Sequence, residues 1–241
     1  MKNREVWPAG VTTRSCWDRV TSSVTCASEM ARARSPKPTD EETLLALLRS
    51  IARGEASVVA TLAMSPDLAS QQVAGGATRD DAATWYLTEI EHYVYAGDTP
   101  LHVAAAAYRP DLVPVLLARG ARVSAKNRRG AEPLHYAADG GPNLPTWNPL
   151  AQAATVTCLI EAGANPNALD KSGVAPLHRA VRTRCTAAVR ALLAGGADSH
   201  RANKSGSTPL DLATQTTGRG GSGSPEARRE QVEIVRLLRE R

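Results

Sequence analysis

Three histidines in one recurring motif are the first residues whose type and spacing suggest chemistry. His102, His135 and His178 each follow a Pro-Leu pair and lie 33 and 43 residues apart. Imidazole is the commonest metal ligand and a frequent general base. Equivalent positions in stacked helical units lie on the order of 10 Å apart, whereas zinc needs its ligands at about 2 Å. We therefore expect each histidine to be hydrogen-bonded within its own turn and not to share a metal ion.

Cations are the second chemical signal. A glycine stands three residues before each motif proline, and the two positions before these glycines read Tyr95-Ala96, Arg128-Arg129, Lys171-Ser172 and Lys204-Ser205. Three successive turns thus present cations at the pitch of the repeat. Such a row would bind an acidic partner through electrostatic complementarity. The plainer alternative is a set of solvated turn charges.

Further candidates lie next to these turns. Arg179 and Arg182 would extend the cation row onto an inner face beside Tyr108 and Tyr136, and Trp147 stands in an insertion. Tyrosine and tryptophan are enriched at binding hot spots, so we expect these three aromatics to be exposed. The predicted partner-binding set is Arg128, Arg129, Lys171, Lys204, Arg179, Arg182, Tyr108, Tyr136 and Trp147.

Short helices must position these side chains. Each motif proline, at 100, 133, 176 and 209, can occupy the first turn of a helix, where its missing N–H costs nothing. A second helix ends in Leu-Leu-x-x-Gly-Ala at 116–121 and again at 192–197. Neither helix is long enough to be stable alone, so the pairs must stack to bury a shared core. With no Phe and only 4% aromatics, that core is expected to consist of Ala, Leu and Val.

The motif Gly-x-Thr-Pro-Leu-His and the Leu-Leu-x-x-Gly-Ala ending resemble the ankyrin repeat. The whole chain also resembles a group of bacterial ankyrin proteins that share an N-terminal helical extension and insertions at the same places. The resemblance implies an all-α solenoid with β-turn fingers and a binding role. It divides residues 95–241 into four repeats, at about 95–127, 128–170, 171–203 and 204–241. Insertions are expected within 140–150 and 218–229.

The residues before the first repeat are expected to close one end of the stack. Thr39-Asp40-Glu41-Glu42 is a capping box before an amphipathic helix that ends at Gly54. A second helix is expected over 56–64 and a third from Asp80 to about Tyr93. Together these form an N-terminal helical capping region over 38–94. Residues 1–37 have the composition of a disordered tail.

The distribution of charge and the absence of catalytic motifs reduce the number of function classes that fit the sequence. The net charge of +5 divides into −6 over 38–96 and +6 over 97–207, so the chain is polarised and not uniformly basic. The sequence contains no P-loop, nucleophile elbow or metalloprotease motif. We therefore predict a non-enzymatic, cytoplasmic protein-binding module with no cofactor, metal or small-molecule substrate, and with a protein partner that has an acidic surface.

Two alternatives stay open. A nucleic-acid or anionic-surface binder would use the basic turns and the Arg-rich tail, and its affinity would fall steeply with salt. An enzyme or inhibitor subunit would place its site between Trp147 and the glycine-rich segment at 218–224.

Overall fold

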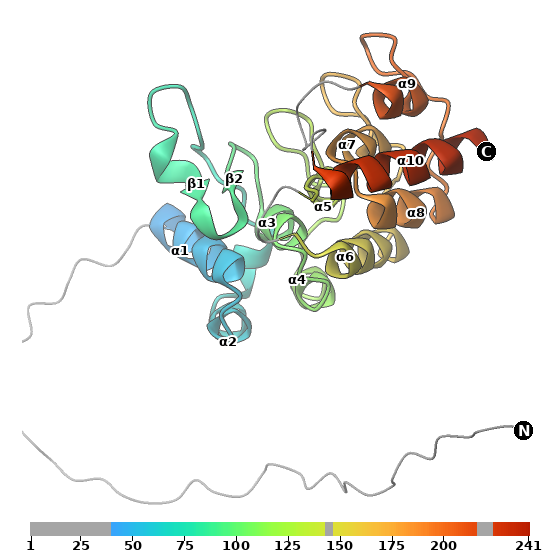
Figure 1. The fold of residues 1–241 in the computed structure, drawn as a ribbon. Helices are drawn as coiled ribbons and strands as arrows, with labels where there is room; N and C mark the ends of the chain where they lie inside the picture. Colours follow the sequence, from blue (N-terminus) through green and yellow to red (C-terminus); the bar gives the residue numbers. More distant parts are fainter. Residues whose placement is uncertain (1–39, 143–146, 216–223) are drawn as a thin grey trace, which may run out of the picture. The chain divides into compact units, whose positions relative to one another are not determined.

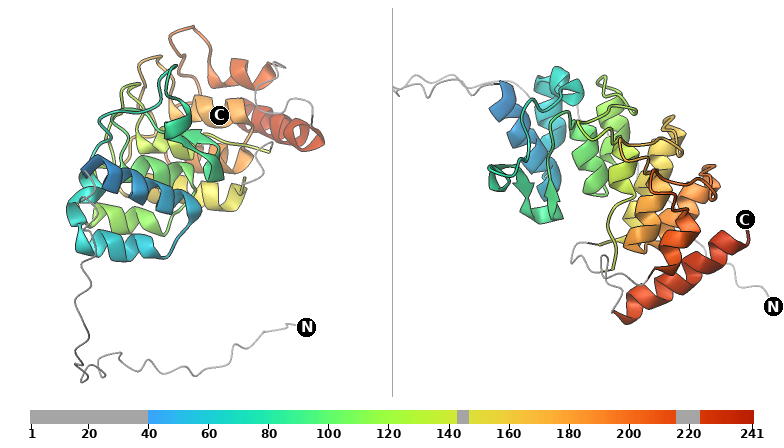
Figure 2. Two further views of the ribbon diagram at one scale, coloured as in Figure 1. Left: turned by 90° about the vertical axis from the view of Figure 1, so that its left-hand side faces the viewer. Right: turned by 90° about the horizontal axis from the view of Figure 1, so that it is seen from above.

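Paired helices stacked in two rows form the architecture (Figures 1 and 2). The computed structural model describes residues 40–142, 147–215 and 224–241. The predicted tail at 1–37 lies outside these residues, as do 143–146 and 216–223 of the predicted insertion regions. The described part is mainly helical, as the sequence predicts, with one two-stranded sheet.

Each motif proline is the first residue of a helix. These first helices are α3 (Pro100–Ala106), α5 (Pro133–Ala137), α7 (Pro176–Thr183) and α9 (Pro209–Thr214). The second helices are α4 (Leu112–Leu117), α6 (Pro149–Glu161), α8 (Thr186–Ala194) and α10 (Pro225–Arg239). Helix α3 packs on α5 and α7 packs on α9, while α6 packs on α8 and α8 on α10. Each first helix and the second helix that follows it form one unit. The first helices of successive units make one row of the stack, and the second helices make the other.

Two further helices precede the first motif. Helix α1 (Asp40–Arg53) buries Leu44, Leu47, Leu48 and Ile51 on one face. This three- and four-residue spacing is that of an amphipathic helix. Helix α1 packs on α3 and on α2 (Ser57–Met64). Both helices agree with the sequence expectation, and the pair extends the stack beyond α3.

The predicted third helix over 80–93 is wrong. This segment holds short 3₁₀ turns at Ala83–Trp85 (η2) and Thr88–Ile90 (η3), and strands β1 (Tyr86–Leu87) and β2 (His92–Tyr93). The strands pair antiparallel, and the nitrogen of Val94 donates to the oxygen of Trp85 at 2.8 Å. Aromatic and β-branched residues favour strands. The hairpin turn ends at Glu91, whose φ of 48° is incompatible with a continuing right-handed helix.

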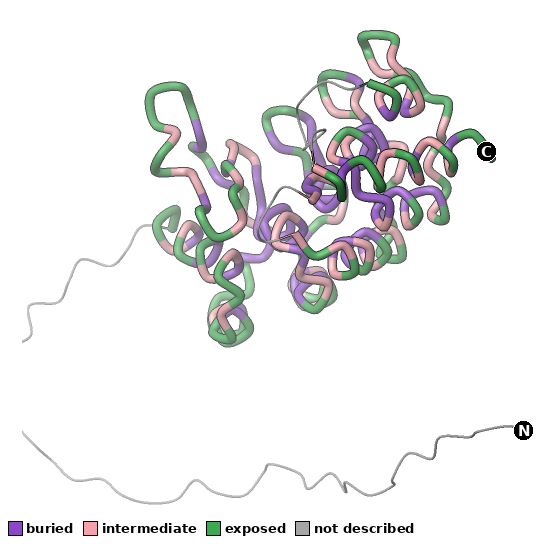
Figure 3. The backbone as a smooth tube through the Cα atoms, in the orientation of Figure 1, coloured by how far each residue is buried: buried purple, intermediate pink, exposed green. Residues whose placement is uncertain are grey.

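One aliphatic core runs through the stack. A single cluster of buried residues extends from Leu44 in α1 to Leu238 in α10. Its largest fully buried side chains are all leucine or isoleucine, and many alanines are buried with them. Figure 3 shows the buried backbone gathered where the helices meet and the exposed backbone at the turns. Exposed residues therefore gather at the turns between units, although Asp98 and Asn127 in these turns are buried.

Candidate functional site

The motif histidines bind neighbouring backbone. Nδ1 of His102 accepts a hydrogen bond from the nitrogen of Thr99 at 3.2 Å, and its Nε2 lies 3.1 Å from the oxygen of Ala131 in the next unit. In His135 the same atoms contact the nitrogen of Glu132 and the oxygen of Val174, both at 3.1 Å. Because Nδ1 accepts, a neutral ring carries its proton on Nε2, which donates to the carbonyl.

These contacts explain the histidines without catalysis. Burial lowers the pKa of His102, and it lowers the pKa of His135 to about 4, so both rings are neutral at pH 7. Nδ1 of His178 likewise accepts from the nitrogen of Ala175 at 3.2 Å. In the fourth unit Asp211 takes this place, and its Oδ2 accepts from the nitrogen of Thr208 at 2.8 Å. The expectation of a histidine hydrogen-bonded within its turn is confirmed.

The turns that carry the cations, here called the fingers, are joined along their backbones. The nitrogen of Arg128 donates to the oxygen of Ala96 at 2.7 Å, and that of Lys171 donates to the oxygen of Arg129 at 2.9 Å. The nitrogen of Lys204 continues the series to the oxygen of Ser172 at 3.3 Å. Four consecutive fingers therefore stack in contact.

The finger cations face solvent along this row. Arg128, Arg129, Lys171 and Lys204 are all exposed. The Nζ of Lys204 donates to the main-chain oxygen of Lys171 at 2.6 Å, which ties the Lys204 side chain to the preceding finger. We call these four residues the finger row.

A small basic pocket lies at the start of the finger row. The Tyr95 ring has the guanidinium of Arg129 at 4.2 Å from its centroid and that of Arg128 at 5.2 Å, both within the range of cation–π attraction. The pocket has a volume of about 230 Å³, and its wall includes Arg79 and Tyr93. None of the described residues in this wall is acidic. Sequence reasoning missed Arg79, because it lies about fifty residues before Arg128 and Arg129 and belongs to no motif.

Arg179 does not extend the finger row, contrary to the sequence expectation. Its guanidinium pairs with Asp170 at 3.1 Å and with Asp139 at 3.5 Å, and its side chain is 12% exposed. The positive charge is therefore neutralised within the stack. Arg182, three residues further along α7, is exposed.

The expected exposure of Tyr136 and Tyr108 is also wrong. Tyr136 is 2% exposed, and its hydroxyl donates to Oδ2 of Asp98 at 2.9 Å and accepts from Nδ2 of Asn127 at 2.8 Å. Tyr108 is 9% exposed, and its hydroxyl donates to the main-chain oxygen of Asp139 at 2.6 Å. Burial raises the pKa of both hydroxyls. Both tyrosines thus use their polar ends inside the protein.

Trp147 is half-buried and packs against the core. Its Nε1 donates to Oε1 of Gln152 at 3.0 Å, and the Nε2 of that glutamine reaches the oxygen of Ala137 at 3.0 Å. The indole therefore anchors the start of α6 to the end of α5. Trp147 is therefore less exposed than the sequence predicts, and its N–H is used inside the protein.

Stacked helix pairs with hydrogen-bonded fingers define a helical-repeat solenoid, and comparison with known proteins identifies its class. The family model for the ankyrin repeat matches residues 96–128, and the model for ankyrin repeats in many copies matches 159–213. The chain is an ankyrin repeat protein with an all-α solenoid fold. Ankyrin repeats indicate a protein–protein interaction module, and such domains are typically non-enzymatic.

Curated relatives match only through a short segment. The E3 ubiquitin-protein ligase KEG of Arabidopsis thaliana is 38% identical over 92 residues, which are 37% of this chain and 5% of the ligase. Alpha-latrotoxin-Lhe1a of Latrodectus hesperus and alpha-latrotoxin-Lt1a of Latrodectus tredecimguttatus are 34% and 33% identical over 96 residues, 39% of this chain and 6% of each toxin. Because the chain matches about one twentieth of their length, their activities are not transferred to it.

In the ranges that the structure describes, no helix combines the length and the apolar character needed to cross a bilayer.

Proposed function

We propose that this ankyrin repeat protein binds an acidic segment of a partner protein along the finger row, without catalysis. The observation that carries the proposal is the stacking of the fingers, whose backbone hydrogen bonds hold Arg128, Arg129, Lys171 and Lys204 in one exposed series. A surface that is already ordered loses little entropy on docking, so a few charged contacts suffice for specificity. In this proposal residues 38–94 cap one end of the stack, and residues 95–241 form four ankyrin repeats.

The pocket at the first finger supports an acidic partner. Arg79, Arg128 and Arg129 converge on it, and two tyrosine rings line its wall. A carboxylate placed there can accept charge-assisted hydrogen bonds from more than one guanidinium. Five of the predicted binding residues lie away from the fingers. Four of them, Arg179, Tyr108, Tyr136 and Trp147, are not part of the proposed contact surface, because they are buried or half-buried and their polar groups have partners inside the protein.

The test is an affinity pull-down that compares three forms of the full-length chain. The finger variant carries Arg128→Glu, Arg129→Glu, Lys171→Glu and Lys204→Glu. The control variant makes the same change in net charge with Arg49→Glu, Arg122→Glu, Arg239→Glu and Arg241→Glu, at exposed positions away from the finger tips. Circular dichroism checks that all three forms fold.

We expect one specific protein to bind the wild type and the control variant but not the finger variant. Equal retention by all three forms would refute the finger proposal. Binding that is lost after nuclease treatment or after removal of residues 1–37 would favour the nucleic-acid or anionic-surface alternative instead.

A further inference from the structure

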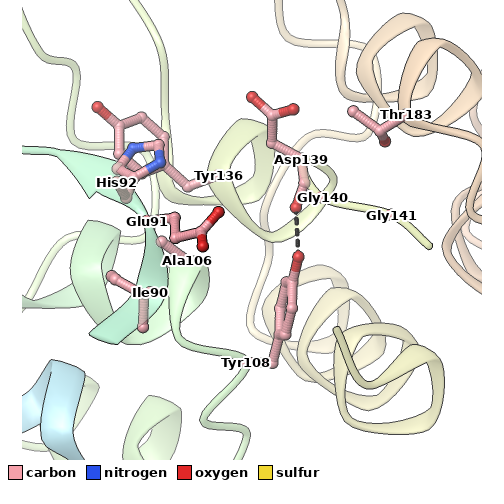
Figure 4. A pocket seen from close by; sticks show the side chains of 10 residues that line it. All are labelled: Ile90, Glu91, His92, Ala106, Tyr108, Tyr136, Asp139, Gly140, Gly141 and Thr183. Carbon is pink, nitrogen blue, oxygen red and sulfur yellow. Dashed lines mark hydrogen bonds between the residues drawn. The ribbon is translucent and has the colours of Figure 1, made fainter. Parts of the chain in front are cut away.

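A second pocket, separate from the finger row, opens beside the β1–β2 hairpin (Figure 4). Its volume is about 320 Å³, at the lower end of the range for small-ligand sites. Glu91 and His92 come from the hairpin, and Tyr136 and Asp139 come from α5 and the turn that follows it. Tyr108 forms another part of the wall. None of the finger-row cations lines this pocket.

The polar side chains that line this pocket include two carboxylates and an imidazole. Figure 4 shows the Glu91 carboxylate pointing from the hairpin toward Tyr108 and Asp139. Among the described residues this carboxylate has no ion pair or hydrogen bond. Nε2 of His92 is buried and likewise has no partner in the described ranges. The hydroxyl of Tyr108 is already donated to the main-chain oxygen of Asp139.

The balance of charge around this pocket is negative. The carboxylates of Glu91 and Asp139 line it, and Asp98 lies behind the Tyr136 ring as the acceptor of its hydroxyl. Arg179 is the nearby cation, and it is shared between Asp139 and Asp170. Of the described residues that line the pocket, none is a lysine or an arginine. A positively charged group would therefore complete the site.

Backbone strain gathers at the same place. Among the described residues, the non-glycine residues with positive φ are Glu91 at 48°, Tyr108 at 51° and Arg184 at 62°. Glu91 and Tyr108 line the pocket, and Arg184 follows Thr183, which also lines it. Strained conformations of this kind cluster at ligand-binding sites.

We propose that this pocket binds the guanidinium group of an arginine side chain presented by a partner protein. Burial lowers the pKa of His92, so its ring is neutral and has one nitrogen that can accept a hydrogen bond. A guanidinium offers five N–H donors in one plane, so it can serve more than one of the acceptors on Glu91, Asp139 and His92. Its plane also packs on tyrosine rings, whereas the ammonium of lysine is a strongly hydrated point charge. This proposal takes the source of the arginine, a partner protein, from the protein-binding function proposed above. It does not depend on the finger row.

The probe is the blocked amino acid N-acetyl-arginine methylamide, titrated into the full-length chain and followed by NMR chemical shifts. Its neutral counterpart, N-acetyl-citrulline methylamide, has nearly the same shape without the charge. We expect saturable binding of the arginine compound, with shifts at His92 and Tyr108, and a dissociation constant at least tenfold lower than for citrulline. Glu91→Gln should raise the dissociation constant for arginine at least tenfold. Glu161→Gln, the same change at an exposed residue of α6, should leave it unchanged.

Three outcomes would overturn the proposal: equal affinity for arginine and citrulline, equal or tighter binding of blocked lysine, or unchanged arginine binding in Glu91→Gln. The comparison of the three compounds uses the wild-type chain, so it does not depend on the folding of a variant. The finger variant should still bind arginine within about threefold at 0.15 M salt, where the screening length is about 8 Å. A finger variant that loses its partner but keeps arginine binding separates the two proposals.

Discussion

The hydroxyl of Tyr136 donates a hydrogen bond to Oδ2 of Asp98, 2.9 Å away and 38 positions earlier in the sequence. Both side chains are buried, and Asp98 also accepts from Nδ2 of Asn127 at 2.9 Å and from the nitrogen of Tyr95 at 2.7 Å. A charged acceptor inside the protein is stable only while donors surround it. This network therefore joins the first finger to the first helix of the second unit.

Replacing Tyr136 by phenylalanine removes one of these donors and keeps the ring. We expect the free energy of unfolding to fall by about 1–3 kcal/mol, since the carboxylate of Asp98 loses a hydrogen bond where water does not replace it. Urea denaturation at pH 7 measures the change. Tyr93→Phe is the control, because Tyr93 is 40% exposed, and it should change stability by less than about 0.5 kcal/mol. Equal losses in both variants would contradict this account.

The neutral His135 predicts acid sensitivity. Its pKa of about 4 in the folded protein lies below the value of about 6.5 in the unfolded chain, so the unfolded state binds more protons between these values. Stability contributed by the neutral ring is therefore complete above pH 6.5 and lost as the pH falls toward 4. Between pH 7 and pH 4.5 the loss should be about 2 kcal/mol.

His135→Asn isolates this effect, because the carboxylates titrate in both proteins. Urea denaturation of the two proteins at pH 7 and pH 4.5 gives four free energies of unfolding. We expect the wild type to lose about 2 kcal/mol more than the variant between these pH values. An identical loss in the two proteins would show that His135 does not carry the pH dependence.

Gly97 should tolerate substitution less well than Gly196. Both have positive φ, at 85° and 89°, which costs an L-residue about 1–2 kcal/mol. A Cβ on Gly97 would also lie 2.8 Å from Cα of Asn127 in the next finger, whereas one on Gly196 meets nothing within 4 Å. We expect Gly97→Ala to destabilise by about 2–4 kcal/mol and Gly196→Ala by about 1–2 kcal/mol in thermal unfolding. Equal costs would mean that the fingers can move apart freely.

Arg179 and Arg182 lie on the same helix and should differ in their contribution to stability. Arg179→Ala leaves Asp170 and Asp139 without their shared cation in a mostly buried setting, so we expect a loss of about 2–3 kcal/mol. Arg182→Ala removes an exposed side chain and should change stability by less than about 0.5 kcal/mol. Chemical denaturation of both variants makes the comparison. If Arg179→Ala changes stability as little as Arg182→Ala does, the ion pairs of Arg179 with Asp170 and Asp139 do not stabilise the fold.

The sequence predicts best what depends on neighbouring residues. A proline in the first turn and a glycine before it are local signals, and α3, α5, α7 and α9 each begin at the motif proline. The stacked finger row also follows from the repeated motif, since the turn before each motif proline takes an equivalent position in the stack whatever the length of the insertion between two motifs. These features need no knowledge of distant contacts.

Features that depend on contacts between residues far apart in the sequence could not be predicted from local motifs. Tyr136 is a plausible surface aromatic until Asp98, 38 positions away, is seen to accept its hydroxyl hydrogen. Arg179 has the charge expected of a finger cation, but Asp139, 40 positions earlier, takes part of it. The hairpin at 86–93 is held by Ala77, whose nitrogen donates to the oxygen of Val94 at 2.7 Å. Each error concerns a long-range contact that periodicity does not encode.

The backbone hydrogen bonds between fingers have a consequence for how a bound segment would be read. Because the nitrogen of Lys171 is tied to Arg129 and that of Lys204 to Ser172, the interval from one charge to the next cannot stretch to suit its ligand. The protein would then select partners by the spacing of their acidic side chains. One residue inserted between two acidic side chains of the partner would matter more than exchanging aspartate for glutamate.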